Sequence, residues 1–191
     1  MAVMSKEMEE LVVKFEKVLR DFPEVKYAGD PILRQVTEEV TVEEGEILGE
    51  KLGKVLIRYR EADGYGRGFA APQIDENKSV FVTFVDGELH TFINPKILEK
   101  SEKTNFYREL CLSSGIMSAD TERAEWIVIV MEWTDTEGQK HKEKVEGFLA
   151  RLYQHEEAHL RGKLNLDEAS EGGIEFALFD PLKEQLREKK N

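Results

Sequence analysis

Apolar residues recur at helical spacing in three stretches of the chain. The first covers residues 8–19, with Ser5 as a suitable N-cap before it and Pro23 at its end. The second covers residues 42–60, and the third covers residues 147–160. Side chains that recur every three to four residues share one face of a helix. The pattern therefore predicts three helices, and the first is expected to be amphipathic and packed against the body of the protein.

Runs of β-branched and aromatic residues lie between the second and third helices. They predict strands at residues 80–85 and 91–93, joined by an Asp-Gly turn, with the Asn-Pro pair at residues 94–95 ending the second strand. Residues 97–110 are expected to form a strand pair or one bent strand. A strongly apolar run at residues 126–133 predicts a further strand, followed by a turn and another strand at about residues 140–145.

The C-terminal tail carries Gly172 and Gly173 and then a short predicted helix after Pro181. We expect this tail to pack on the body, in preference to a docking element whose basic end touches RNA. Residues 1–191 are expected to form a single α+β domain. In it, mixed or antiparallel strands pack around the helix of residues 147–160.

Composition and charge narrow the class of protein. The 191 residues suit one domain, and the formal net charge is −12. Such an acidic chain argues against a broad phosphate-binding footprint, so no direct nucleic-acid binding is expected. The N-terminus has no apolar signal core, and no stretch approaches the roughly 20 apolar residues of a membrane helix. These features predict a cytoplasmic protein that does not contact a membrane.

The strongest chemical signal is the sequence His155-Glu156-Glu157-Ala158-His159 in the third predicted helix. Residues four apart stand one turn from each other on one face, so both imidazoles can reach one cation. The Glu156 carboxylate can then reach a water in the open position of that cation. This spacing predicts a catalytic metal site.

Two histidines leave such a site incomplete, because catalytic sites of this type use three protein ligands. Glu168 and Glu171 lie downstream, as in many peptidases that carry this motif. Cys111 is the alternative, since a thiolate is a strongly donating ligand and a single cysteine cannot form an intrachain disulfide. The motif alone leaves the choice open.

A glycine-rich segment covers residues 64–73 and ends in Ala-Ala-Pro-Gln. It lacks the Gly-Lys-Ser/Thr ending of a phosphate-binding loop. Gly66 and Gly68 would let a ligand approach the backbone closely, and Gln73 offers an amide donor for a developing oxyanion. Taken alone, the segment is better interpreted as a tight turn.

Three motifs in order resemble those of the peptide deformylase family. They are the Ala-Ala-Pro-Gln loop at residues 70–73, Glu-x-Cys-Leu-Ser at 109–113, and Gln-His-Glu-x-x-His at 154–159. The resemblance runs from about Tyr27 to Asp167 and includes Gly-Asp-Pro-x-Leu-Arg near its start. It implies an enzyme that removes the formyl group from the N-terminal methionine of newly made polypeptides.

The resemblance also implies the roles of individual residues. Cys111, His155 and His159 would bind one divalent metal, most often Fe²⁺ in this family, although Zn²⁺ or Ni²⁺ can occupy the site. Glu156 would be the general acid and base for a water at the metal. Gln73 and the backbone N–H of Leu112 would hold the oxyanion.

Five positions are expected to contact or orient the substrate: Gly66, Arg67, Gly68, Glu109 and Arg151. The implied partner is an N-formylated peptide, including a nascent chain at the ribosome. The protein is expected to be a monomer.

Several positions depart from the family pattern. Leu110 replaces a glycine, Ala158 replaces an aspartate, and Ser118 stands where an arginine is common. Arg67 and Arg151 replace apolar residues near the expected methionine pocket. Residues 64–65 resemble a two-residue insertion before the glycine loop.

Three hypotheses follow. The chain is a working deformylase, a related hydrolase for another N-acyl substrate with a polar or acidic side chain, or a non-catalytic metal-binding homologue. The retained Glu156 counts against the third, since a structural metal site has no need of an acid or base beside it.

Overall fold

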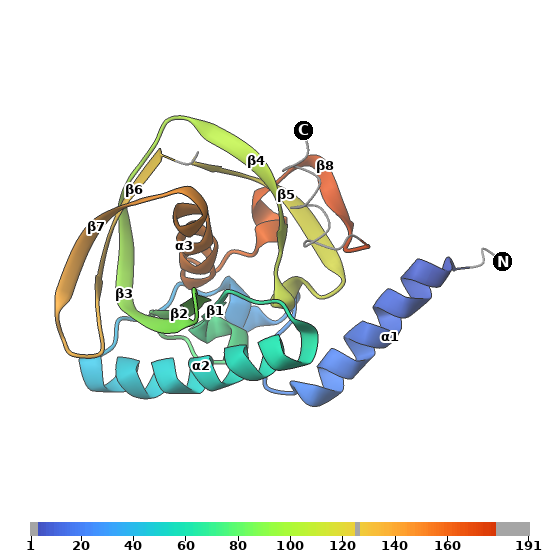
Figure 1. Ribbon diagram of the computed structural model, residues 1–191, viewed down its shortest axis with the longest axis horizontal. Helices are drawn as coiled ribbons and strands as arrows, with labels where there is room; N and C mark the ends of the chain where they lie inside the picture. The colour runs from blue at the N-terminus through green and yellow to red at the C-terminus, as the bar shows by residue number, and fades with distance from the viewer. Residues whose placement is uncertain (1–3, 125–126, 179–191) are drawn as a thin grey trace.

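The computed structural model describes residues 4–124 and 127–178, which form an α+β fold (Figure 1). The helices are α1 (Lys6–Asp21), α2 (Val42–Asp63) and α3 (Gly147–Leu160). The strands are β1 (Gly68–Ala70), β2 (Val80–Val85), β3 (Glu88–Lys100), β4 (Thr104–Leu110), β5 (Met117–Ala124), β6 (Ile127–Thr134), β7 (Lys140–Glu146) and β8 (Ala169–Phe176). Short 3-10 helices join them: η1 (Pro31–Arg34), η2 (Ala71–Ile74), η3 (Leu112–Ser114) and η4 (Asn165–Glu168).

Capping residues determine where helix α1 begins and where helix α2 begins and ends. Ser5 accepts a hydrogen bond from the backbone N–H of Met8 at the start of α1. Thr41 and Glu44 form a reciprocal capping box at the start of α2, and Gly64 ends that helix in the left-handed conformation. The three helices expected from the apolar pattern are therefore confirmed, with α2 ending slightly later than expected.

The strands form two antiparallel sheets. The first has the order β1-β2-β3-β6-β7, and the second has the order β4-β5-β8. Figure 1 shows α3 surrounded by strands of both sheets, with α2 along one side of the molecule and α1 at its flank. Both β1 and β4 are edge strands, and the site described below lies beside them.

The core has two parts, one on each face of the first sheet. Along β2, Val80 and Val82 pack with residues of α2, whereas Phe81 faces the opposite way and packs with Tyr153 of α3. Successive strand residues point to opposite faces of the sheet. A strand that is covered on both faces therefore has a continuously apolar sequence. This double burial holds α3 firmly against the sheet.

Two predictions about the strands were wrong. The Asn-Pro pair at residues 94–95 does not end the second strand, because β3 continues through it to Lys100 by way of a register shift between Ile93 and Lys96. Asn94 adopts a φ of 50° there, and such a bulge accommodates a proline that cannot donate to the ladder. Residues 97–110 contain the end of β3 and all of β4, but these belong to different sheets and do not pair with each other.

The beginning of the tail packs on the body, as expected, through a strand that the sequence did not predict. Gly172 and Gly173 lie inside β8, which pairs with β5 through Met117, Ser118 and Ala119. The helix predicted after Pro181 lies outside the described residues. Within residues 4–124 and 127–178, none of the helices combines the length and apolar character needed to cross a bilayer.

Candidate active site

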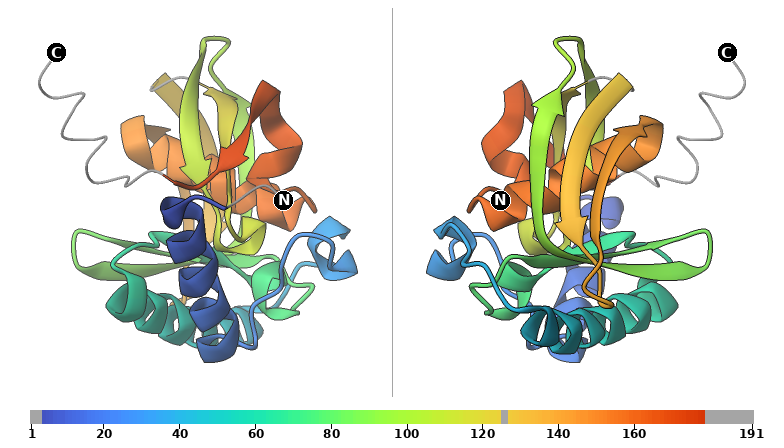
Figure 2. Two further views of the ribbon diagram at one scale, coloured as in Figure 1. Left: turned by 90° about the vertical axis from the view of Figure 1, so that its right-hand side faces the viewer. Right: turned by 90° about the vertical axis from the view of Figure 1, so that its left-hand side faces the viewer.

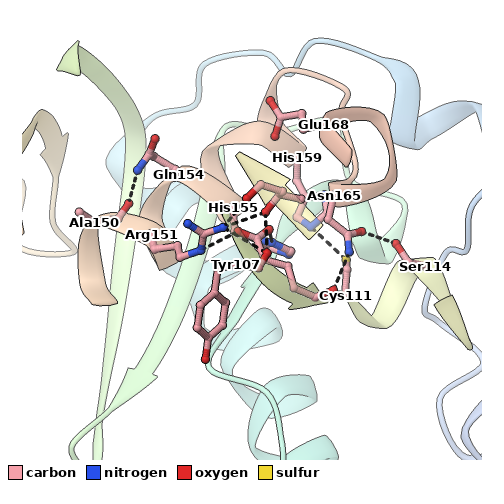
Figure 3. A network of polar contacts seen from close by, with 12 residues as sticks. Tyr107, Cys111, Ser114, Ala150, Arg151, Gln154, His155, His159, Asn165 and Glu168 are labelled. Atoms are coloured by element: carbon pink, nitrogen blue, oxygen red, sulfur yellow. Dashed lines mark hydrogen bonds and ion pairs between the residues drawn. The ribbon is translucent and has the colours of Figure 1, made fainter. Parts of the chain in front are cut away.

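Cys111, His155 and His159 come together at the centre of the molecule. Helix α3 presents the two imidazoles one turn apart, and Cys111 follows the last residue of β4. One ligand atom from each of the three lies within 4.8 Å of the other two, and Cys111 Sγ is 3.3 Å from His159 Nε2 (Figure 3). A thiolate and two imidazoles at these separations fit one divalent transition metal, with a coordination position left for another ligand.

Buried hydrogen bonds orient this group. The Nδ1–H of His155 donates to Glu109 Oε2 over 2.8 Å, so Nε2 is the nitrogen left to bind a metal. Asn165 holds the segment that carries Cys111 from both sides. Its Nδ2 donates to the backbone carbonyl of Glu109 over 3.1 Å, and its Oδ1 accepts from Ser114 Oγ over 2.5 Å. Sequence reasoning missed Asn165, because a single asparagine after the third helix gives no local signal of this role.

The charge state of Cys111 suits metal binding. Burial alone would raise the pKa of the thiol, but His159 and His155 outweigh burial and hold that pKa well below its usual range. The thiolate is the form of cysteine that ligates metals.

Glu156 lies beside the metal-binding group and is 3% exposed. Burial raises the pKa of its carboxyl to about 7. Gly68 makes room for this carboxyl, since a Cβ added at Gly68 would lie 2.2 Å from Glu156 Oε1. A carboxyl whose pKa is near neutrality can both accept and donate a proton.

Gln73 is held in η2 with its amide turned toward Cys111. Its Oε1 accepts from the backbone N–H of Ala70 over 2.9 Å, and its Nε2 donates to Ser113 Oγ over 3.0 Å. The same nitrogen is 3.7 Å from Cys111 Sγ. The fixed oxygen leaves the amide N–H groups as the donors beside the metal-binding group.

One cavity of about 520 Å³ opens over this centre. Its lining includes every residue predicted for the site except His159, which lies deeper and contacts Cys111. The volume is in the range of about 300–1,000 Å³ that is typical of ligand sites. Tyr107, Phe148 and Leu152 give one end of the cavity an apolar wall.

The structure changes the interpretation of Arg151. The sequence left open whether this guanidinium reaches solvent or a surface carboxylate, or instead serves an acidic or polar side chain of the substrate. Instead, its Nη1 donates to Asn105 Oδ1 over 2.8 Å, and its Nη2 donates to the carbonyl of Thr121 over 2.7 Å. Its Nε is 3.3 Å from Glu109 Oε1. Arg151 therefore joins α3 to β4 and β5, and its donors are engaged by the protein.

Arg67 and Gly66 lie in the loop before β1. Arg67 is exposed, and its guanidinium carbon is 4.7 Å from the ring centroid of Phe148, so it covers the rim of the cavity. Gly66 has a φ of 98° and accepts a hydrogen bond from Arg60 through its carbonyl. A positive φ favours glycine at this position.

The other departures from the family pattern have simple structural consequences. Leu110 ends β4 in an extended conformation opposite Ser118, so no left-handed residue is needed there. Ser118 is fully buried and donates to the carbonyl of Glu175 over 3.3 Å, which places it between β5 and β8. Ala158 is 1% exposed and packs in the interior.

Comparisons with known proteins agree with this geometry. The family model described as polypeptide deformylase matches residues 23–173. A peptide deformylase from Thermotoga maritima is 34% identical over 76% of this chain and 86% of its own length. One from Treponema pallidum is 34% identical over 81% of this chain and 93% of its own.

Solved structures show the same similarity. The crystal structure of the Thermotoga maritima peptide deformylase superposes with a TM-score of 0.68, at 34% identity, over 76% of this chain and 96% of the other. A Plasmodium falciparum peptide deformylase superposes with a TM-score of 0.69, at 28% identity, over 86% of this chain and 95% of the other. The fold, the buried thiolate and imidazoles and the family match agree, and we conclude that the chain belongs to the polypeptide deformylase family.

Proposed function

We propose that this protein removes the N-formyl group from the N-terminal methionine of newly made polypeptides. The observation that carries the proposal is the buried group of Cys111, His155 and His159, with Glu156 in the wall of the same cavity. Water adds to the formyl carbon and the C–N bond breaks, giving formate and a free amino terminus.

The metal proposed for the site is Fe²⁺, with Zn²⁺ and Ni²⁺ as ions that the same donors accept. Cys111, His155 and His159 would hold it. A divalent cation bound there would lower the pKa of a water molecule and polarise the formyl carbonyl. A soft thiolate with two imidazoles binds several first-row ions, so the donors support the proposal without selecting one ion.

Glu156 is proposed as the residue that moves protons. It takes a proton from the attacking water and then passes it to the leaving amine. The raised pKa of its carboxyl, about 7, supports both steps, because neither the acid nor the base form is strongly disfavoured near neutrality.

Gln73 and Leu112 are proposed to stabilise the negative charge that develops on the formyl oxygen. The Gln73 amide is already fixed by Ala70 and Ser113, so donating to the oxyanion requires only that its longer contact with Cys111 Sγ be exchanged. The backbone N–H of Leu112 is the second proposed donor, and Leu112 lines the cavity directly after Cys111.

The substrate backbone is proposed to lie between the edge strands β1 and β4, as an added strand alongside Gly66 and Gly68. Its methionine side chain would pack against the wall formed by Tyr107, Phe148 and Leu152. Because the donors of Arg151 are engaged by the protein, this wall suits an apolar side chain better than an acidic one.

We further propose that the chain is one catalytic domain that acts as a monomer in the cytoplasm. Nascent chains at the ribosome are its proposed substrates. The acidic composition, with a net charge of −12, supports action on the peptide without direct nucleic-acid binding.

The first test is formate release from formyl-Met-Ala-Ser by anaerobically prepared Fe²⁺ protein. We expect turnover by the wild type and a loss of about 10²–10⁴-fold in Glu156→Ala, since the proton transfers would lose their carrier. Glu157→Ala is the matched control, because its neighbouring carboxylate pairs with Arg161 instead. A folded, metal-loaded wild type that releases no formate would refute the proposed function.

A further inference from the structure

Helix α1 forms part of the cavity wall although it lies outside residues 23–173, which match the family. Its lining residues are Leu11, Lys14, Phe15 and Val18. Their spacing of three and four residues places them on one face of the helix. No residue of α1 is fully buried, so this apolar face is only partly used in packing.

Contacts at both sides hold α1 in place. Lys14 Nζ is 2.6 Å from Asp63 Oδ1 at the end of α2, and Tyr59 donates to the other oxygen of Asp63 over 3.0 Å. The Phe15 ring packs edge-to-face on Tyr27 with centroids 5.3 Å apart. Figure 1 shows α1 at the flank of the molecule, and it faces the viewer in the left-hand view of Figure 2.

One rim of the cavity, formed by β4 and the segment after it, runs from α3 to α1. Tyr107 lies under the guanidinium of Arg151, whose carbon is 5.1 Å from the ring centroid. After β4 ends at Leu110, the chain reaches Gly115, where an added Cβ would lie 3.0 Å from Phe15 Cζ. This rim therefore begins beside α3 and ends against α1.

The opposite rim, formed by the loop before β1, runs the same way. Arg67 stacks on Phe148 of α3, whereas Tyr65 lies under Lys14 of α1, with Nζ 5.3 Å from the ring centroid. A peptide lying between the two rims thus has α3 at one end and α1 at the other.

We propose that α1 is the wall of a second side-chain subsite, which favours a large apolar residue after the formylmethionine. This inference rests on the proposed function, since it takes the methionine to lie at the α3 end. A strand advances about 3.3 Å per residue, so the second and third residues of an extended substrate lie about 3 and 7 Å along the rims from the methionine at the α3 end. Leu11 and Phe15 would contact the second or third residue of the substrate.

The test uses the full chain and three peptides: formyl-Met-Ala-Ala, formyl-Met-Leu-Ala and formyl-Met-Ala-Leu. We expect kcat/KM to be about tenfold higher for one of the leucine peptides than for the alanine peptide, mainly through a lower KM. That is the effect of partly burying one leucine side chain.

Leu11→Ala and Phe15→Ala should each bring the ratio of kcat/KM between the leucine and alanine peptides closer to one. Phe15 also packs on Tyr27, so Leu11→Ala provides a second variant that spares the aromatic contact. Val13→Ala is the matched control on the same helix, since Val13 is 62% exposed and absent from the cavity lining. It should keep the wild-type preference.

The proposal would be overturned if the wild type cleaved all three peptides with equal kcat/KM. It would also be overturned if the preference for leucine persisted in both Leu11→Ala and Phe15→Ala. If Leu11→Ala or Phe15→Ala instead dissociates a dimer in sedimentation, α1 is an interface between copies and the subsite is also refuted. If no peptide releases formate, the proposed function fails. Calorimetric titration with the same peptides still tests the subsite in that case. Equal affinities for the three peptides would reject it, and tighter binding of a leucine peptide would support it.

Discussion

The centre of the cavity and its α1 wall are built in different ways. Glu156 and His159 are 3% and 2% exposed, and hydrogen bonds fix their neighbours: His155 donates to Glu109, and Gln73 donates to Cys111. Helix α1 has no buried residue, and its contacts with the body include the ion pair of Lys14 with Asp63, the ring contact of Phe15 with Tyr27 and half-buried apolar side chains. Local opening costs less where few apolar groups are buried.

We expect the buried centre to determine the rate of the reaction and the α1 wall to determine the choice of substrate. A change at the centre disturbs groups that must stay within hydrogen-bonding distance of one another, so it should cost activity on every substrate. A change in the α1 wall alters contacts with residues remote from the formyl group, so it should act on some substrates more than others. Variants of the two regions should therefore differ in whether they affect every substrate or only some.

Gln73→Ala should lower kcat by about 10²–10³-fold on every formyl peptide, because it removes a fixed donor from the oxyanion. Steady-state kinetics on the three peptides of the α1 test measures this loss. Gln73→Glu keeps an acceptor for the backbone N–H of Ala70 but has no amide donor, so it should be impaired as well. Gln139→Ala, in the exposed turn before β7, is the control.

If the loss of kcat in Gln73→Ala differed from one peptide to another, the proposed division between the centre and the α1 wall would be wrong. It would mean that the amide contributes to binding a side chain rather than to the reacting carbonyl. The same would follow if Gln73→Glu retained full activity.

Arg151→Met should have a smaller effect, which falls mainly on stability. The variant loses the hydrogen bonds to Asn105 and Thr121 and leaves the buried Glu109 carboxylate without this cation. We expect a decrease of about 1–3 kcal/mol in the free energy of unfolding, measured by urea denaturation. Arg67→Met is the control, since its guanidinium is exposed at the rim.

The same pair of variants tests substrate choice. Because the donors of Arg151 are engaged, the wild type should cleave formyl-Met peptides faster than formyl-Asp or formyl-Glu peptides. A wild-type preference for the acidic peptides that disappears in Arg151→Met would restore the hypothesis of an acidic substrate.

The parts of the molecule that sequence predicted best are those set by local spacing. The caps at Ser5 and Thr41 and the apolar stripes determine α1 and α2 within a few residues. The three ordered motifs placed Cys111, His155 and His159 together, because the spacing in the helix and the resemblance indicated the same site.

Long-range pairing accounts for what sequence did not predict. The continuation of β3 past Asn94 depends on pairing with β6, and the glycine-containing strand β8 depends on pairing with β5. The partners of Arg151 lie 30 and 46 residues away, at Thr121 and Asn105. No local pattern records such contacts, so a charged residue in an expected apolar wall could be interpreted only as a substrate contact or a surface group.

Asp120→Asn should have the smallest effect, and it should depend on pH. Arg108 holds the pKa of Asp120 below its usual range through hydrogen bonds across β4 and β5. A lowered pKa stabilises the fold at pH values above the unfolded pKa, and that stability is lost as pH falls through the folded pKa. Both side chains are partly exposed, so we expect a difference of about 0.5–1 kcal/mol between wild type and variant near neutrality.

The difference should disappear in acid, when Asp120 of the wild type is protonated, and Glu137→Gln in the exposed turn before β7 should show no such trend. Urea denaturation at several pH values measures it. Since Asp120 lines the cavity, Asp120→Asn should change KM more than kcat if the wall is separate from the chemistry. An equal fall in kcat on all substrates would show instead that this wall and the centre act as one unit.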